Sequence, residues 1–570
     1  PAAELTWVER AGKAAVLRIT PTDNYRRGTF ALKLRSEEPV AAGKHAVLRL
    51  RLRAVAGEGE SAGQVGFSAR LFGARPDRDR PEKLLDLPVT VGEEWETVEL
   101  SRRLERDYEA GGLEVELRPL YFSPVTEIAE WRLSAAEEPP AAQDRRIYPG
   151  QEPDAAWRAE AAQRIDRHRR GDLRIRVLDH HGNPVPGASL RIEQQGHHYP
   201  FGTAVVANRI VDAPRHLYTE EFSAEETRIR NAHNAIYREK LSRLFNYAVF
   251  ENDLKWPFWI EPNHWRRPEW AYEAMQWLGE RDFLVKGHTL VWGSWSQTPS
   301  WLRQYEDDPE ALQERILLHI EDVGAATRDH VQQWDVLNEP MSHRDIIEIV
   351  GMEGVAEWFK KAREVLPGVE LVVNDFDLIG NYGSRHRQES FIAFVEELLD
   401  RGAPVDAIGF QSHFWSTRLT PPEDILRTID RFAELGLNLY VTEFDMNYPD
   451  EGVQADYTRD FLTAWFSHPA TDGFLMWGFY GDAHWFGETG AMFRTDWEPK
   501  PNALEYQRLL FEHWWTDRSL QTGDDGIAAC RPFYGQQAIE VTADGFLPAA
   551  RRIDHTPASP ATLTILLTPQ

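Results

Sequence analysis

Two glutamates follow short apolar segments in the middle of the chain. Glu339 lies two residues after segment 334–337, and Glu443 directly follows segment 439–442. If their carboxyl groups lie about 5–5.5 Å apart, the pair suits double displacement at an anomeric carbon, in which one attacks and the other protonates the leaving oxygen. Each glutamate taken alone has a simpler reading as a solvated residue at the end of a strand.

Further polar and aromatic residues accompany other apolar segments of the same region. They are Glu251, Asn252, Lys255, His288, Trp292, Asn338, Gln411, His413, Trp477 and Trp485. No phosphate-binding glycine loop accompanies them, because neither GxGxxG nor GxxxxGK[ST] occurs. The set therefore favours a site of carboxylates, amides, histidines and tryptophans rather than a nucleotide site.

Eight apolar segments alternate with helical patterns between about 199 and 517. They are 201–206, 247–250, 284–292, 334–337, 371–374, 407–410, 439–442 and 474–479. One intervening pattern has apolar residues at Ile425, Ile429 and Phe432, with Gly436 placed to end the helix. We predict a (β/α)8 barrel, in which the polar residues meet where the strands end. A doubly wound open sheet is the alternative.

The flanking regions are rich in short alternating segments. We predict a β-sandwich at 1–135, then a linker with a short helix at 136–171. Strand patterns return at 172–197, before the barrel at 198–517, and again at 518–570. The chain is therefore expected to be multidomain.

Composition limits the partners and the compartment. The net charge of −27 argues against nucleic acid, and no apolar run is long enough for a membrane helix. Cys530 is the one cysteine, which excludes an internal disulfide framework and a cysteine-based zinc cluster. We expect no cofactor or metal ion at the site, and a monomer. Since Pro1 begins no leader, either the protein is intracellular or a signal was removed, and we expect secretion or periplasmic location.

Seven ordered motifs resemble glycoside hydrolase family 10, the family of xylanases. They are FENDLKW (250–256), GHTLVW (287–292), WDVLNEP (334–340), NDFD (374–377), IGFQSH (408–413), VTEFDM (441–446) and PKPNALEY (499–506). The resemblance implies a retaining endo-β-1,4-xylanase acting on xylan-type polysaccharide. It makes Glu339 the general acid/base and Glu443 the nucleophile, kept ionised by His413. Nearby negative charge is expected to raise the pKa of Glu339.

The resemblance also assigns sugar-binding roles. It implies that Asn338 bonds the sugar 2-OH, that Lys255 and His288 bind the same ring, that Glu251 and Asn252 hold the next sugar, that Gln411 supports the site, and that Trp477, Trp485 and Trp292 surround it. For Trp292 and Asp335 the alternative is packing or support of neighbouring residues. Where many members read WHSQ after the third strand, residues 292–297 read WGSWSQ. The loop 481–492 also departs, which leaves substrate length and sugar identity open.

The two flanking regions carry weaker resemblances. Residues 1–135 resemble carbohydrate-binding modules, with sugar binding and a purely structural role both open. Stacking candidates are Trp7, Tyr25, Phe67, Phe72, Tyr108 and Tyr121. Residues 172–193 resemble the first strands of small transthyretin-like sandwiches, which predicts one sandwich completed by 518–570 and split by the barrel. Alternatively, 172–193 packs on the barrel and 518–570 folds alone.

Two further functions remain open. One is a catalytically silent polysaccharide-binding protein, which would not need a nucleophile such as Glu443. The other keeps the mechanism but acts on a different β-glycan, as the altered loops allow.

Overall fold

The structure is a computed structural model in which the chain forms two compact units, Pro1–Trp157 with Phe414–Glu423, and Arg158–His413 with Asp424–Gln570. It describes residues 3–8, 16–21, 31–55, 65–75, 81–119, 125–139, 147–212, 223–261, 267–380, 385–415, 419–448 and 450–570. Within these residues, no helix has the length and apolar character needed to cross a membrane.

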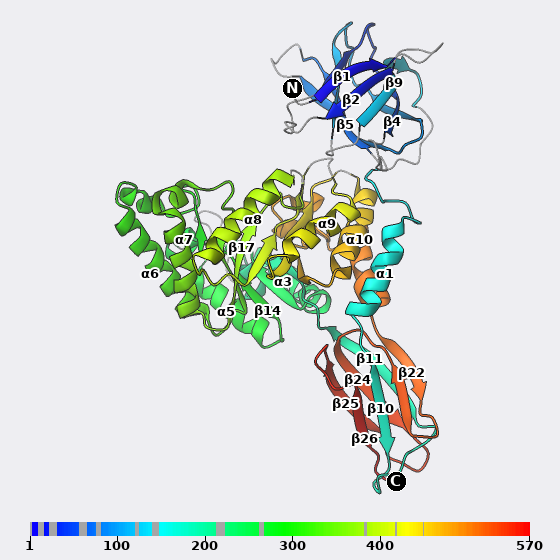
Figure 1. Ribbon diagram of the computed structural model, residues 1–570, viewed down its shortest axis with the longest axis vertical. Helices are drawn as coiled ribbons and strands as arrows, with labels where there is room; N and C mark the ends of the chain where they lie inside the picture. The colour runs from blue at the N-terminus through cyan, green and yellow to red at the C-terminus, as the bar shows by residue number, and fades with distance from the viewer. Residues whose placement is uncertain are drawn as a thin grey trace. The chain divides into compact units, whose positions relative to one another are not determined.

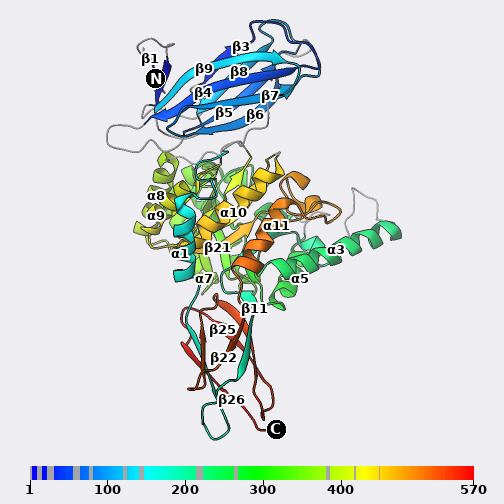
Figure 2. The same cartoon turned by 90° about the vertical axis from the view of Figure 1, so that its right-hand side faces the viewer.

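The N-terminal region forms two packed antiparallel sheets (Figure 2). One sheet has the order β1-β2-β9-β4-β7 and comprises β1 (Ala3–Val8), β2 (Val16–Pro21), β9 (Val125–Ala136), β4 (His45–Val55) and β7 (Glu96–Arg103). The other has the order β3-β8-β5-β6 and comprises β3 (Leu32–Arg35), β8 (Leu113–Pro119), β5 (Val65–Gly73) and β6 (Glu82–Val91). Alternating apolar residues of β4, Leu48, Leu50 and Leu52, lie in the core between the sheets.

The stacking candidates of this sandwich have mixed outcomes. Phe67 and Tyr108 are buried in the core, which makes them unsuitable as sugar contacts. Tyr25 and Tyr121 lie outside the described residues, as does the side chain of Trp7.

The central region is a closed parallel barrel, so the open-sheet alternative is wrong (Figure 1). Its strands are β12 (Phe201–Val205), β13 (Tyr247–Phe250), β14 (Leu284–Gly287) with β15 (Val291–Trp292), β16 (Gln333–Asn338), β17 (Glu370–Asp375), β18 (Ala407–Phe410), β20 (Asn438–Met446) and β21 (Thr471–Met476). The pairings β12–β21 and β14–β16 complete the ring. Two segments differ from expectation: the third strand is interrupted at 288–290, and Trp477 lies just after β21.

Helices connect the barrel strands and surround them. They are α2 (Ala207–Ile210), α3 (Ala224–Leu244), α4 (Trp256–Ile260), α5 (Pro268–Gly279), α6 (Pro309–Thr327), α7 (Asp345–Val365), α8 (Arg385–Asp400), α9 (Pro422–Ala433), α10 (Glu451–Ser467) and α11 (Pro501–Arg508). Local sequence sets their starts: Ser223 and Glu226 form a capping box at α3, and Asp308 caps α6 before a proline. The short helix predicted within 136–171 forms as α1 (Ala156–His168), where Arg158 pairs with Asp460 of α10 at 2.6 Å.

The small sandwich is assembled from both sides of the barrel. Strand β10 (Leu173–Leu178) pairs with β23 (Ile527–Cys530) and β26 (Thr562–Leu566). Strand β11 (Ser189–His197) pairs with β22 (Asp517–Gln521) and β24 (Gly535–Thr542), and β25 (Ala549–His555) extends that sheet. Their inward residues form one core. The expected pairing of 172–193 with 518–570 is thus present. The partners are needed because two strands alone cannot bury such a core.

Candidate active site

Glu339 follows β16 at the rim of the barrel and is surrounded by polar side chains. Its backbone has φ 55° and donates its N–H to the carbonyl of Asn374 at 2.8 Å. Gln411 donates to Glu339 Oε1 at 3.0 Å, and Nδ1 of His343 lies 2.8 Å from Oε2. Oε1 of this buried carboxyl therefore accepts a hydrogen bond, whereas Oε2 has a short contact with His343 Nδ1 that lacks the alignment of a hydrogen bond.

Glu443 lies within β20, and its buried carboxylate has two different partners. Asn374 donates to Oε1 at 2.7 Å, and Nε2 of His413 lies 3.1 Å from Oε2. Nδ1 of His413 lies 2.8 Å from Asp445. Burial lowers the pKa of His413, but Asp445 and Glu443 outweigh burial and raise that pKa to about 10. The imidazolium is therefore a lasting positive charge beside Glu443.

A chain of amides links the two glutamates. Asn338 Oδ1 accepts from Asn374 at 3.0 Å and from Gln411 at 3.3 Å. Asn338 and Asn374 are cross-strand partners, and Gly409 beside them leaves room, since a Cβ there would lie 2.2 Å from Asn374 Oδ1. With its oxygen occupied, Asn338 keeps its Nδ2 donor without a partner among the described residues. A bound hydroxyl would satisfy that donor.

A buried charged group orients His288. Lys286 Nζ donates to Asp335 at 2.6 Å and to Gln333 at 2.7 Å, and His288 Nδ1 lies 2.8 Å from the other Asp335 oxygen. With Asp335 fixing one ring nitrogen, Nε2 of His288 remains for another partner. Asp335 thus contacts both Lys286 and His288, which corresponds to the supporting role left open by the sequence.

Lys255 and its neighbours lie at the end of β13. Lys255 Nζ donates to Asn252 Oδ1 at 2.9 Å and lies 5.1 Å from the ring centroid of Trp292. Glu251 donates its backbone N–H to Val205 at 3.2 Å. Trp292 is half-buried, and its Nε1 has no hydrogen-bond partner in the described part of the chain. The arrangement offers an ammonium, an amide and an indole N–H to one side of the rim.

Two tryptophans lie around His413. The ring centroids of Trp477 and Trp485 lie 6.1 Å and 5.3 Å from that of His413, and His288 lies 5.5 Å from Trp477. Trp485 donates Nε1 to Asp445 while half its surface stays exposed. The loop 481–492, which departs from the family pattern, thus supplies a side chain at the rim.

The expected rise in the pKa of Glu339 is wrong for this arrangement. Burial does raise that pKa, but the contacts with His343 and Gln411 outweigh burial and leave it below its usual value. Glu339 in turn raises the pKa of His343 against the effect of burial. A proton on this pair therefore favours the imidazole.

Sequence reasoning missed three residues that contact the two glutamates or their partners. His343 and Asn374 contact glutamate oxygens directly, and Asp445 holds His413. Asn374 and Asp445 belong to the NDFD and VTEFDM motifs, and this membership could have identified them. His343 follows Glu339 by four residues, and a backbone turn at this spacing can bring the two side chains together. Among the described residues, no group of three His, Cys, Asp or Glu side chains has an arrangement suited to a metal ion.

Comparisons with known proteins find relatives among xylanases and one anti-sigma factor. Endo-1,4-beta-xylanase B of Thermotoga neapolitana is 30% identical over 298 residues, covering 48% of this chain and 84% of the relative. Anti-sigma-I factor RsgI6 of Acetivibrio thermocellus is 27% identical over 396 residues, covering 68% of this chain. The chain spans about half of that relative's length, at 47%.

A solved structure and a family model complete the comparison. Xylanase 10B from Thermotoga petrophila RKU-1, solved with xylobiose, is 26% identical, with a TM-score of 0.46 over 55% of this chain and 94% of that one. The model of glycosyl hydrolase family 10 matches residues 215–507, more than half of the chain. This chain therefore belongs to glycosyl hydrolase family 10.

Proposed function

We propose that the protein is a retaining endo-β-1,4-xylanase. The observation that carries the proposal is the link between Glu339 and Glu443 through Asn338, Asn374 and Gln411. Two carboxyl groups held by one amide network at the mouth of a barrel suit attack and protonation on either side of a glycosidic bond.

The reaction follows from the partners of each carboxyl. Glu443, held by Asn374 and the His413 imidazolium, attacks the anomeric carbon while Glu339 protonates the leaving oxygen. Glu339 then takes a proton from water, whose oxygen displaces Glu443. The free donor of Asn338 would bind the 2-OH of the reacting sugar.

The proposed substrate is xylan. The Thermotoga neapolitana relative is named a xylanase. Lys255, Asn252 and Glu251, to which the family resemblance assigns sugar binding, follow β13, and Lys255 donates to Asn252. The purified chain should release short oligosaccharides from xylan and do little on cellulose. Faster turnover of cello-oligosaccharides than of xylo-oligosaccharides would assign the same mechanism to another β-glycan.

The competing function is silent polysaccharide binding. His413 argues against it, because an imidazolium held between Glu443 and Asp445 serves an attacking carboxylate and has no use in a binder. Hydrolysis of a chromogenic β-xyloside separates the two functions, provided that Glu443→Ala abolishes it and the exposed-residue variant His386→Asn does not.

We also propose that the protein works as a monomer in the periplasm or outside the cell, where polymeric xylan is found. Light scattering on the purified chain gives the mass, and activity in fractions of the native source gives the compartment. A dimer, or activity confined to the cytoplasm, would contradict this.

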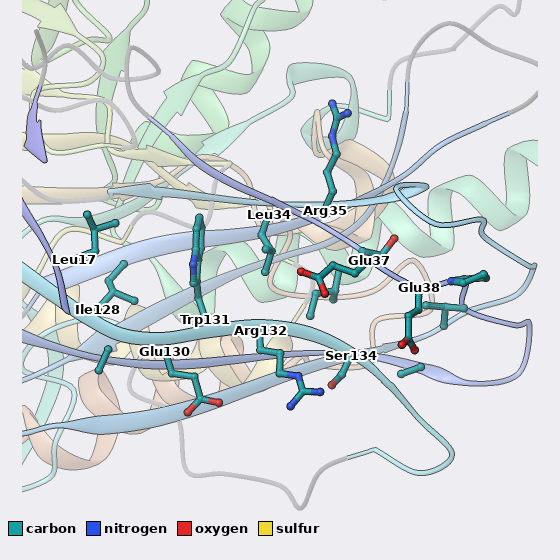
Figure 3. A pocket seen from close by; sticks show the side chains of 16 residues that line it. Leu17, Leu34, Arg35, Glu37, Glu38, Ile128, Glu130, Trp131, Arg132 and Ser134 are labelled. Carbon is teal, nitrogen blue, oxygen red and sulfur yellow. The ribbon is translucent and has the colours of Figure 1, made fainter. Parts of the chain in front are cut away.

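We further propose that the N-terminal sandwich binds glycan. The observation that favours this is a cavity of about 730 Å³ between β9 and β3, which Figure 3 shows with Trp131 among its lining side chains. Trp131 is partly exposed beside Leu17, Leu34 and Ile128, and an indole face of this kind packs well on a sugar ring.

Polar groups at the same cavity suit sugar hydroxyls. Glu37, Glu38 and Arg132 line it and form no ion pair with any described residue. With Glu443→Ala added to stop hydrolysis, the chain should bind xylohexaose in calorimetry, and Trp131→Ala should weaken that binding about tenfold or more. Trp95→Ala, which removes a tryptophan packed against Arg53 instead, is the matched control. Binding unchanged in a folded Trp131→Ala protein places any glycan elsewhere.

A further inference from the structure

His343 is the feature of the site that neither the family motifs nor the proposed function uses. After Glu339 the chain makes one tight turn, in which the N–H groups of Ser342 and His343 donate to the Glu339 carbonyl at 3.2 and 3.0 Å. This turn places Nδ1 of His343 2.8 Å from Glu339 Oε2. The contact is therefore built into the local backbone.

The altered loop after β15 packs against the same turn. A Cβ on Gly293 would lie 2.7 Å from the His343 carbonyl oxygen, and Ile346 donates its N–H to the Gly293 carbonyl at 3.1 Å. Ser294 donates its hydroxyl to Asp345 at 3.0 Å. The missing side chain at 293 thus gives the His343 segment its room.

The ring of His343 has one aromatic neighbour. It packs edge-on against Trp292, with centroids 5.6 Å apart, and about a quarter of its side chain remains exposed. In this orientation Nδ1 faces the carboxyl without the alignment of a hydrogen bond, so sharing a proton requires a small rotation of the ring.

Charged groups of both signs surround the pair. Asp345 of α7 and Asp375 of β17 act on His343 along with Glu339, and both favour the imidazolium. Burial raises the pKa of Asp375 to about 7, against the effect of Arg387, which bonds it at 2.7 Å. Across the site, His413 acts on Glu339, and Lys255 lies over Trp292.

We propose that His343 is a positioning residue that holds the Glu339 carboxyl and shares one proton with it, so that the two side chains form one acid/base unit. This rests on the role proposed for Glu339. As the bond from the anomeric carbon to the leaving oxygen breaks, that oxygen keeps the electron pair and takes the shared proton through Glu339. The unit is then unprotonated, and it regains one proton from the water whose oxygen displaces Glu443.

The sharing has a definite consequence for the pH profile. A proton held by either of two sites is held at least as tightly as by one of them alone. The alkaline limb of kcat/KM on xylo-oligosaccharides should therefore lie at lower pH in His343→Asn, by about one unit or more. The loss at neutral pH should be larger on xylo-oligosaccharides than on an activated aryl glycoside, whose leaving group needs little protonation.

Two measurements test the proposal, and only one depends on catalysis. In histidine-labelled protein, the NMR titration of His343 should move to lower pH in Glu339→Gln, because the carboxylate that holds its proton is gone. The His343 signal is identified by its absence from His343→Asn, and His343→Gln replaces that variant if it does not fold. An exposed histidine of α8 gives the control variant His386→Asn, which should leave the limb and the titration unchanged.

The outcomes separate this proposal from the proposed function. An unchanged His343 titration in folded Glu339→Gln overturns the shared proton whether or not the protein cleaves xylan. A shifted titration with an alkaline limb that stays in place in His343→Asn overturns the role in catalysis. A shifted titration in a protein without glycosidase activity leaves the pair intact and rejects the proposed function instead.

Discussion

The two glutamates are held by histidines in different ways. His413 lies buried between Glu443 and Asp445, whereas His343 is partly exposed and contacts one carboxylate, Glu339, directly. The pKa of His413 accordingly reaches about 10, and Glu339 raises the pKa of His343 against the effect of burial. One side of the site thus has a fixed charge across the physiological range, and the other can gain and lose a proton.

This difference suits the reaction step proposed for each glutamate. A nucleophile needs a constant environment because it must be ionised whenever substrate arrives, while an acid/base must change its protonation within each cycle. Two carboxylates hydrogen-bond His413 directly whereas one contacts His343, and this difference favours the contrast.

The largest effect should come from the fixed side. Glu443→Ala removes the attacking group and should lower kcat on every β-xyloside by about 10⁴- to 10⁶-fold, as for loss of a covalent nucleophile. Steady-state rates on xylan and on an activated aryl xyloside measure it. A loss restricted to xylan would mean that Glu443 does not attack.

The titrating side should give a loss that depends on the leaving group. Glu339→Ala should lower kcat/KM on xylan by about 10²- to 10⁴-fold, the usual contribution of general acid catalysis, and much less on an activated aryl xyloside. A plot of rate against leaving-group pKa checks this. Equal losses on both substrates would remove Glu339 from the acid role.

A smaller effect concerns stability and pH. Because the pKa of His413 is raised to about 10 in the folded protein, its stabilising contribution is complete below the unfolded pKa of about 6.5 and is lost as pH rises to about 10. The free energy of unfolding should fall by a few kcal/mol across that window, and His413→Asn should flatten the fall. Urea unfolding at several pH values measures it, with His386→Asn as the control that keeps the slope.

The smallest effect lies between the two sides, at Asn338. Its unpartnered donor should bind the substrate 2-OH, so Asn338→Ala should lower kcat/KM about 10- to 100-fold on a xyloside. The same change should matter little on a 2-deoxy substrate. Equal losses on the two substrates would assign Asn338 to support of its neighbours alone.

The sequence predicted the barrel and its rim because both depend on local patterns. Apolar segments at 407–410 and 247–250 coincide with β18 and β13, and Glu339 directly follows β16. The strand expected at 439–442 is longer, since β20 continues past Glu443 to Met446. The split sandwich was also accessible, since 172–193 has two strands that need partners.

What the sequence could not give depends on backbone turns and on pairing across strands. The turn at Glu339 needs φ 55°, which no propensity predicts for glutamate, and that turn brings His343 onto the carboxyl. The lowered pKa of Glu339 follows from this contact, so the opposite expectation failed at the same point. Trp131 was overlooked as a stacking candidate, because its exposure depends on where β9 lies against β3.

The most direct test of the account is the configuration of an azide product. With an activated aryl β-xyloside, Glu339→Ala should be rescued by azide and give the β-xylosyl azide, because the intermediate on Glu443 still forms and azide needs no base. Glu443→Ala, if azide rescues it, should give the α-xylosyl azide by a single displacement. A β product from Glu443→Ala, or an α product from Glu339→Ala, would contradict the assignment of the two roles.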